Sequence, residues 1–118
     1  MKWLCILALA VGCKKSQEAP PPPPNNAPAI PAPEMKRGEH ACNTYIAKAC
    51  TCAETVPAAK AKCTQAQAFP EVLRMGAELT MSTDSEPKDV KQATGTIRKT
   101  IAECIEQTAQ LPALGCPP

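Results

Sequence analysis

The chain has 118 residues, eight of them cysteines, and 13 Lys and Arg residues stand against 11 Asp and Glu residues. A net charge of +2 gives no field that would gather phosphate groups, and three aromatic residues are too few for base-stacking platforms. Composition therefore argues against a nucleic-acid partner. The cysteine content is typical of a disulfide-linked domain made in an oxidising compartment, which argues against a reduced cytosolic protein.

Residues 1–12, MKWLCILALAVG, have the pattern of an export signal. Lys2 precedes an uncharged run that is shorter than the roughly 20 apolar residues a bilayer span requires. The residues before Cys13 resemble the bacterial lipobox, in which the peptide is cut just before a cysteine that receives a diacylglycerol. The resemblance implies lipidation at Cys13, and Lys14 directly after it suggests the outer membrane. The alternative is an ordinary secretory signal or an uncleaved anchor.

Residues 16–34 contain eight prolines and almost no side chain worth burying. Such a segment favours polyproline II at about 3.1 Å per residue, so it predicts a spacer of up to about 60 Å. The expected organisation is a signal peptide at 1–12, a lipidated N-terminus and linker at 13–34, and a folded domain at 35–118.

The domain is expected to be all-α, because apolar residues recur at spacings of three and four and no segment alternates as a strand would. A first helix is predicted over 36–55 and carries the largest number of cysteines. Its apolar face comprises Cys42, Tyr45, Ile46, Ala49, Ala53 and Val56.

A second helix is predicted from Pro57 onwards, with Phe69-Pro70 either interrupting or kinking it. Beyond that pair, the expected apolar stripe is Val72, Met75 and Leu79. Residues 82–85 offer N-caps for a third helix, with Glu86, Pro87 and Asp89 in its first turn. The stripe of that helix is Val90, Ala93, Ile97, Ile101, Cys104, Thr108 and Leu111. The expected fold is a small disulfide-stapled three-helix bundle.

Large apolar side chains are scarce in the domain, so its core alone is marginal and cross-links are expected. An even number of cysteines predicts three disulfides and no free thiol among Cys42, Cys50, Cys52, Cys63, Cys104 and Cys116. On a helical wheel, Cys50 and Cys52 flank the apolar face, so they should reach different helices. In an up-down-up bundle, the depth of each cysteine favours Cys42 with Cys116. Cys50 and Cys52 then divide Cys63 and Cys104 between them.

The spacing also resembles a group of small, uncharacterised lipoproteins of myxobacteria. The residues that carry the resemblance are Cys42, Tyr45, Cys50, Pro57-Ala58-Ala59, Cys104 and Cys116, behind the lipobox and the proline-rich linker. It implies that Cys52 pairs with Cys63 and that Cys50 pairs with Cys104. The resemblance implies a fold more than an activity.

Candidate chemical sites are few. Cys50, Cys52, Cys63 and His40, assisted by Met75 or Met81, could bind a soft metal, but export would oxidise these thiols first, so we expect neither a metal nor a cofactor. His40 is expected to be solvated and Tyr45 half-buried. We expect no catalytic residue, because the acids Glu86, Asp89, Glu103 and Glu106 read as a solvated face.

The sequence predicts a lipid-anchored protein of the bacterial envelope that is not an enzyme and presents a helical surface to a protein partner. The alternative is a periplasmic carrier of a small ligand or a metal. A pocket among the helices would favour the carrier, whereas a solid alanine-rich core would favour the interaction module.

Overall fold

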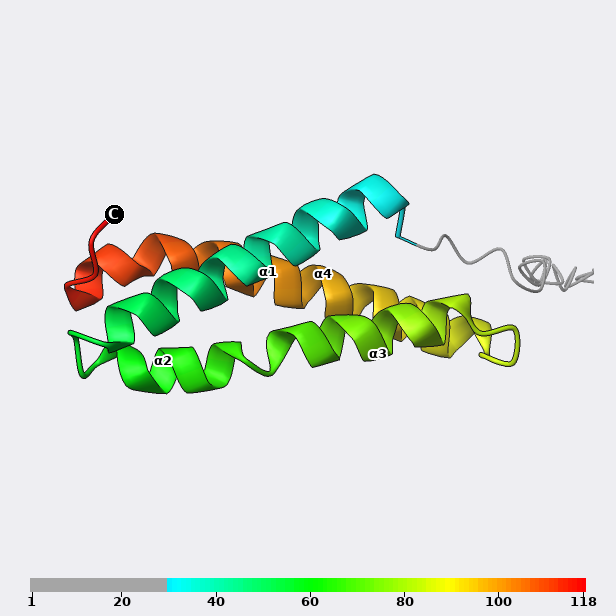
Figure 1. Cartoon of the computed structure of the whole chain (residues 1–118). Coiled ribbons are helices and arrows are strands. Elements are labelled where there is room, and N and C mark those ends of the chain that lie inside the picture. Colours follow the sequence, from blue (N-terminus) through cyan, green and yellow to red (C-terminus); the bar gives the residue numbers. More distant parts are fainter. Residues whose placement is uncertain (1–29) are drawn as a thin grey trace, which may run out of the picture.

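The structure, a computed structural model, describes residues 30–118, so the predicted signal peptide, Cys13 and most of the linker lie outside the described residues. It contains α1 (Ala32–Ala53), α2 (Ala59–Ala66), α3 (Phe69–Met81), α4 (Pro87–Gln110) and a short 3-10 helix, η1 (Leu111–Leu114). Residues 30–118 include no strand. The expected all-α bundle is confirmed, with its second helix broken into α2 and α3 (Figure 1).

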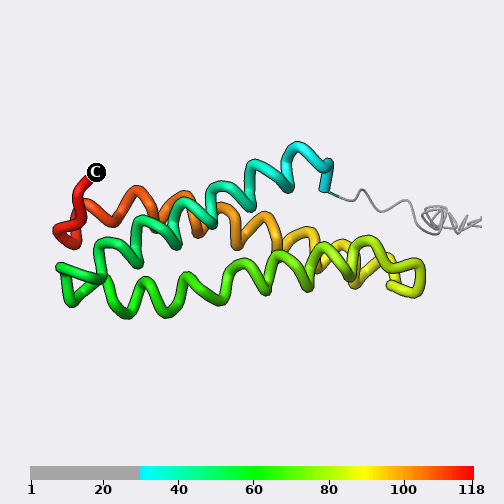
Figure 2. The backbone as a smooth tube through the Cα atoms, viewed as in Figure 1, coloured from blue at the N-terminus to red at the C-terminus, as the bar shows by residue number. Residues whose placement is uncertain are grey.

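The helices run up, down and up along a common axis. Figure 2 shows that the start of α1 lies at the same end of the bundle as the turn between α3 and α4. The C-terminus lies at the other end, beside the turn between α1 and α2. No helix within residues 30–118 combines the length and the apolar character needed to cross a membrane.

Proline lies in the first turn of three α-helices, α1, α3 and α4. Pro33 occupies the first turn of α1, which begins at Ala32, inside the segment predicted as linker. Pro70 occupies the first turn of α3. A proline has no N–H to donate within a helix, and its ring clashes with the preceding helical turn. In the first turn, no helical hydrogen bond is due from that N–H and no preceding turn exists to clash with. The Phe69-Pro70 pair therefore interrupts the second helix and starts a new one.

The turn between α3 and α4 is closed by a serine that the sequence suggested as an N-cap. The Ser85 hydroxyl donates a hydrogen bond of 2.7 Å to the carbonyl of Leu79, near the end of α3. Glu86 holds the N-cap position of α4, with extended backbone and no capping bond from its side chain. The prediction of a cap from residues 82–85 is therefore wrong. Pro87 and Asp89 lie in the first turn as expected.

The most deeply buried side chains of α1 and α4 face each other in the middle of the bundle. Cys42, Tyr45, Ala49, Ile97 and Cys104 are each no more than 1 % exposed. The expectation that Tyr45 is half-buried is wrong, because its ring packs inside the bundle with its centroid 6.0 Å from that of the Phe69 ring. Burial, with a smaller contribution from the Glu103 charge, raises the pKa of the Tyr45 phenol.

Candidate functional site

All six cysteines of the domain are joined in disulfides, as expected for an even number of cysteines. The bonds are Cys42–Cys104, Cys50–Cys63 and Cys52–Cys116. Cys50 and Cys52 do reach different segments of the chain, α2 and the C-terminal tail. The prediction that they divide Cys63 and Cys104 between them is wrong, because Cys104 pairs with Cys42 and only the Cys50–Cys63 bond of that prediction forms.

The predicted pair Cys42–Cys116 is wrong. The reason is the combined length of α4 and η1 beyond Cys104. Cys42 precedes the end of α1 by eleven residues, or about 17 Å at 1.5 Å per residue. Cys104 precedes the end of α4 by six residues, about 9 Å, and η1 adds four more residues at about 2.0 Å each. The two cysteines therefore lie at the same depth, and their Cα atoms are 4.9 Å apart.

The C-terminal tail turns at Gly115 and does not run back along the bundle, as a Cys42–Cys116 bond would require. Gly115 has φ of 97°, in the left-handed region, and the Cys116 N–H donates to the carbonyl of Leu111 at 3.2 Å. This reversal holds Cys116 at the end of the bundle, where it meets Cys52 with a Cα separation of 5.4 Å. Cys52 is therefore unavailable to Cys63 or Cys104.

Both pairings implied by the myxobacterial resemblance, Cys52–Cys63 and Cys50–Cys104, are likewise contradicted. Cys50 and Cys63 face each other across the turn between α1 and α2, with Cα atoms 4.6 Å apart. Since α2 packs along α1 directly after a short turn, the flanking cysteine on that side of α1 reaches α2 rather than α4.

The cysteines considered as soft-metal ligands form disulfides instead. The sulfur atoms of Cys50, Cys52 and Cys63 are each bonded to another sulfur, so none is a thiolate donor in this oxidised state. His40 is exposed on α1. Within residues 30–118, no three His, Cys, Asp or Glu side chains converge in a group that could hold a metal ion.

The acidic side chains of α4 are spread along the helix. Asp89 and Glu103 are separated by fourteen residues, about 21 Å along the axis. Carboxylates that act as an acid–base pair lie within about 10 Å of each other. Glu86 forms an ion pair with Lys88 at 3.3 Å. Glu103 and Glu106 are only three residues apart on α4, but Glu106 is exposed, so these two carboxylates form no buried pair.

Two surface clusters do pair charges. Arg74 binds both Glu71 and Glu78 on the outer side of α3, and its hydrogen bond lowers the pKa of the Glu71 carboxyl. Arg98 on α4 binds Glu34 on α1 at 3.0 Å, and this hydrogen bond lowers the pKa of Glu34. All five side chains are at least one-third exposed, so they are held by pairing rather than by burial.

The apolar stripe predicted for the second helix does not face the core. Phe69 and Leu73 are the buried residues of α3. Met75 is 57 % exposed and Leu79 is 39 % exposed, and Val72 is only half-buried. The prediction of a buried Val72, Met75 and Leu79 stripe is therefore wrong. α3 carries apolar residues on two adjoining faces, and the bundle buries only one of them.

A shallow groove runs beside this outward face, between α3 and α4. Its volume is about 390 Å³, and it is open to solvent along its length. The α3 wall is apolar, whereas the α4 wall mixes small and polar side chains. The residues that line the groove are Val72, Met75, Gly76, Leu79, Asp89, Gln92, Ala93 and Thr96. We use the name α3 outer face for the surface formed by Val72, Met75 and Leu79 together with the groove beside them.

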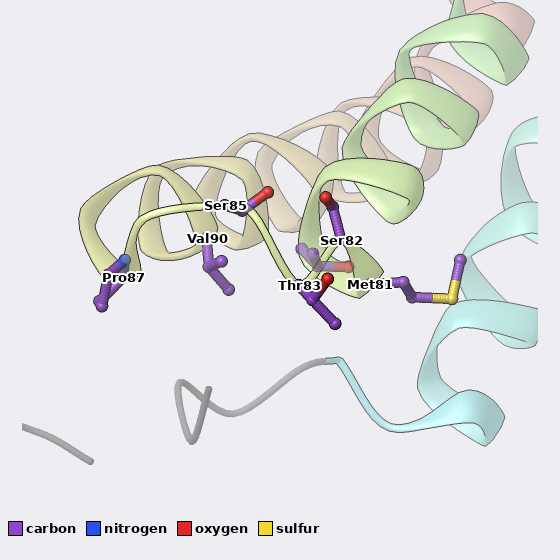
Figure 3. Close-up of a pocket in the computed structure, with 7 residues that line it drawn as sticks. Met81, Ser82, Thr83, Ser85, Pro87 and Val90 are labelled. Atoms are coloured by element: carbon purple, nitrogen blue, oxygen red, sulfur yellow. The ribbon is translucent and has the colours of Figure 1, made fainter. Parts of the chain in front are cut away.

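A smaller hollow of about 160 Å³ lies at the turn between α3 and α4 (Figure 3). Its polar atoms serve the turn itself. Ser85 bonds the end of α3, and the Ser82 hydroxyl accepts a hydrogen bond of 3.4 Å from the Asp84 N–H. The Thr80 hydroxyl donates to the carbonyl of Ala77 at 2.8 Å. We therefore interpret this hollow as part of the turn rather than as a ligand site.

Sequence reasoning missed the α3 outer face because it placed the same residues in the core. The chain matches no protein-family model, no curated protein and no solved structure. The α3 outer face and the disulfide network are the two features on which a functional argument can rest.

Proposed function

We propose that this chain is a lipid-anchored protein of the bacterial envelope that is not an enzyme and binds a protein partner through the α3 outer face. The exposed apolar side chains of α3 carry the proposal. A domain with few large apolar residues leaves Met75 and Leu79 at the surface beside one another, although the fold gains nothing from their exposure. Clustered apolar side chains with a charged rim are typical of a protein-binding surface.

The rim of this surface is charged and the centre is not. Glu71 and Glu78 border the apolar residues on α3, and Arg74 holds both carboxylates in place. Asp89 and Gln92 border the groove on α4. An apolar centre excludes water on binding, and a polar rim keeps the free surface hydrated, so the arrangement suits a surface that is bare until its partner arrives.

The anchor is supported by the sequence before the described residues. The uncharged run ending at Cys13 and the proline-rich segment that follows fit a lipidated, extended tether. α1 begins at the end of the bundle that carries the α3–α4 turn (Figure 2). The tether would therefore enter near this turn, and the disulfide-rich end with Cys50 and Cys63 would point away from the lipid.

A small-ligand carrier is the second candidate, and the α3–α4 groove favours it to some extent. Its volume is near the lower end of the range for small-molecule sites, and Asp89, Gln92 and Thr96 could orient a ligand. Such sites normally cover most of the ligand surface, however, and an open groove covers one side only. Met75 lines the groove and is still 57 % exposed, so a flat protein surface would cover it better than a small ligand in the groove would.

Site-specific photocrosslinking in intact cells tests the interaction. A photoreactive amino acid at position 75 should yield one discrete protein adduct, and the same amino acid at Ile105 should not. Ile105 is the matched control, because it is equally exposed at 57 % but is not part of the α3 outer face. In the position-75 background, Leu79→Lys should abolish the adduct while lowering the thermal midpoint less than Leu73→Ala does. Equal adducts from positions 75 and 105, or none from either, would contradict the proposal.

Fatty-acid labelling tests the anchor separately. Radiolabelled palmitate should enter the wild-type chain and should be absent from a Cys13→Ser variant. Wild-type incorporation into that variant would refute lipidation at Cys13 and leave the interaction proposal to be judged on the crosslinking alone.

A further inference from the structure

The three disulfides differ in their access to solvent. Cys42 and Cys104 are 1 % and 0 % exposed, and Cys52 and Cys116 are 3 % and 6 % exposed. Cys50 and Cys63 are both only half-buried. Thiol–disulfide exchange requires a thiolate to reach one sulfur of the bond. Within the domain, an incoming thiolate therefore has far better access to Cys50–Cys63 than to the other two bonds.

An exposed amide group lies against this bond. Gln67 Nε2 is 3.7 Å from Cys63 Sγ and 3.9 Å from Cys50 Sγ, within range of weak N–H hydrogen bonds to both sulfurs. Cleavage converts one sulfur into a leaving thiolate, and a donor that bonds the charged form lowers the cost of forming it. Gln67 is the C-cap residue of α2 and lies one turn beyond Cys63 on the same side of the helix, so the Cys63 thiolate keeps this donor even if α1 and α2 separate.

The bond also joins α1 to a helix that buries no large side chain. The buried residues of α2 are two alanines, Ala59 and Ala66. Its side-chain hydrogen bond to α4 runs from Lys62 Nζ to Gln107 Oε1 at 3.0 Å. The other two disulfides connect α1 to α4 and to the C-terminal tail. Cleavage at Cys50–Cys63 would therefore loosen α2 and leave α1 and α4 covalently joined.

We propose that Cys50–Cys63 is a thiol–disulfide exchange site, whose reaction partner is a protein dithiol of the Cys-x-x-Cys class. A partner thiolate attacks Cys50 Sγ and forms a mixed disulfide, the Cys50–Cys63 bond breaks, and the electron pair leaves on Cys63, which takes a proton from water. The partner's second thiolate then attacks its own sulfur in the mixed disulfide and releases the Cys50 thiolate, which is protonated in turn. Two electrons pass from the dithiol to the domain.

Reduced glutathione is a suitable probe, because a monothiol leaves the mixed disulfide in place. The oxidised full-length chain, with any free thiol blocked beforehand, is exposed to glutathione without denaturant, quenched in acid and alkylated. Peptide mapping over time should find glutathione on Cys50 and the alkyl group on Cys63 first. Reaction at the two buried bonds should be slower by at least about tenfold, since access limits exchange. Deuterium uptake should rise over residues 59–66 and remain low over residues 42–49.

Two variants sharpen the test. Gln67→Ala should slow exchange several-fold, whereas Gln65→Ala, an exposed glutamine of α2 with no sulfur contact, should exchange at the wild-type rate. Cys50→Ser/Cys63→Ser should lose the fast phase and retain two intact bonds. First reaction at Cys52–Cys116 or Cys42–Cys104, or simultaneous loss of all three bonds, would overturn the proposal. Equal rates in Gln67→Ala and wild type would overturn the role of Gln67.

Discussion

At the centre of the bundle, small residues and sulfur atoms fill the space that large aliphatic side chains occupy in most cores. Ala49, Ala59 and Ala66 are fully buried. Gly76 on α3 allows Ile97 of α4 to approach the α3 backbone, and Gly38 on α1 does the same for Ile101. Close helix contact replaces side-chain bulk, so the fold depends on the few positions where two helices nearly touch.

A pair of glycine substitutions tests this dependence. A Cβ at Gly76 would lie 2.7 and 2.9 Å from Ile97 Cγ1 and Cδ1, and Ile97 is buried, so Gly76→Ala should destabilise the fold. The cost of overpacking, about 1–3 kcal/mol, should exceed the gain of up to about 1 kcal/mol in helix propensity. Gly95 has nothing within 4 Å of its Cβ position, so Gly95→Ala should stabilise by about 0.5–1 kcal/mol.

Urea unfolding of the two variants beside wild type provides the measurement. The midpoints should move in opposite directions, down for Gly76→Ala and up for Gly95→Ala. A Gly76→Ala protein at least as stable as Gly95→Ala would mean that α3 and α4 do not approach as described.

The individual helices were predictable from the sequence, but the orientation of α3 was not. Spacings of three and four identify helices wherever one apolar face stands out, and proline identifies their starts. In α3, both the Phe69–Leu73 side and the Met75–Leu79 side are apolar. Periodicity gives no reason to prefer one of them. The choice is made by tertiary contact, since the Phe69 ring packs against Tyr45 of α1.

Two leucines of the same helix test this orientation. Leu73 is 3 % exposed and Leu79 is 39 % exposed, so the same truncation removes different amounts of buried surface. Leu73→Ala should cost about 2–5 kcal/mol, as is usual for a buried leucine, and Leu79→Ala should cost less than half of that. Denaturant midpoints measured under identical conditions decide the matter. A larger loss of stability for Leu79→Ala than for Leu73→Ala would mean that Leu79, and not Leu73, faces the core.

For the whole molecule, the sequence predicted the number of disulfides but not their partners. The depth of a cysteine along the bundle depends on where the last helix ends, and a proline such as Pro112 is a typical sign of an early end. The chain continues instead through η1 before Gly115 reverses it. A difference of one short 3-10 helix moves Cys104 to the level of Cys42 and leaves Cys116 beside Cys52. Pairing therefore depends on helix length to within a few residues, which local patterns do not resolve.

The long-range bond Cys42–Cys104 should stabilise the fold more than the short-range bond Cys50–Cys63. Cys42–Cys104 spans 62 residues and Cys50–Cys63 spans 13, so the chain-entropy model assigns about 4 kcal/mol to the first and about 3 kcal/mol to the second. Removing the buried pair also leaves a cavity. Cys42→Ala/Cys104→Ala should therefore lower the thermal midpoint more than Cys50→Ala/Cys63→Ala. The reverse order would show that α2 contributes more to stability than its two buried alanines suggest.

The exposed Cys50–Cys63 bond and the position of the C-terminal tail both depend on six cysteines that are oxidised in one specific pattern. Disulfide mapping of the chain recovered from its producing cell, alkylated and digested without reduction, tests this most directly. The account predicts linked peptides for Cys42–Cys104, Cys50–Cys63 and Cys52–Cys116, with none of the six alkylated. A linked Cys42–Cys116 peptide, or alkylated thiols at two or more of these positions, would contradict it.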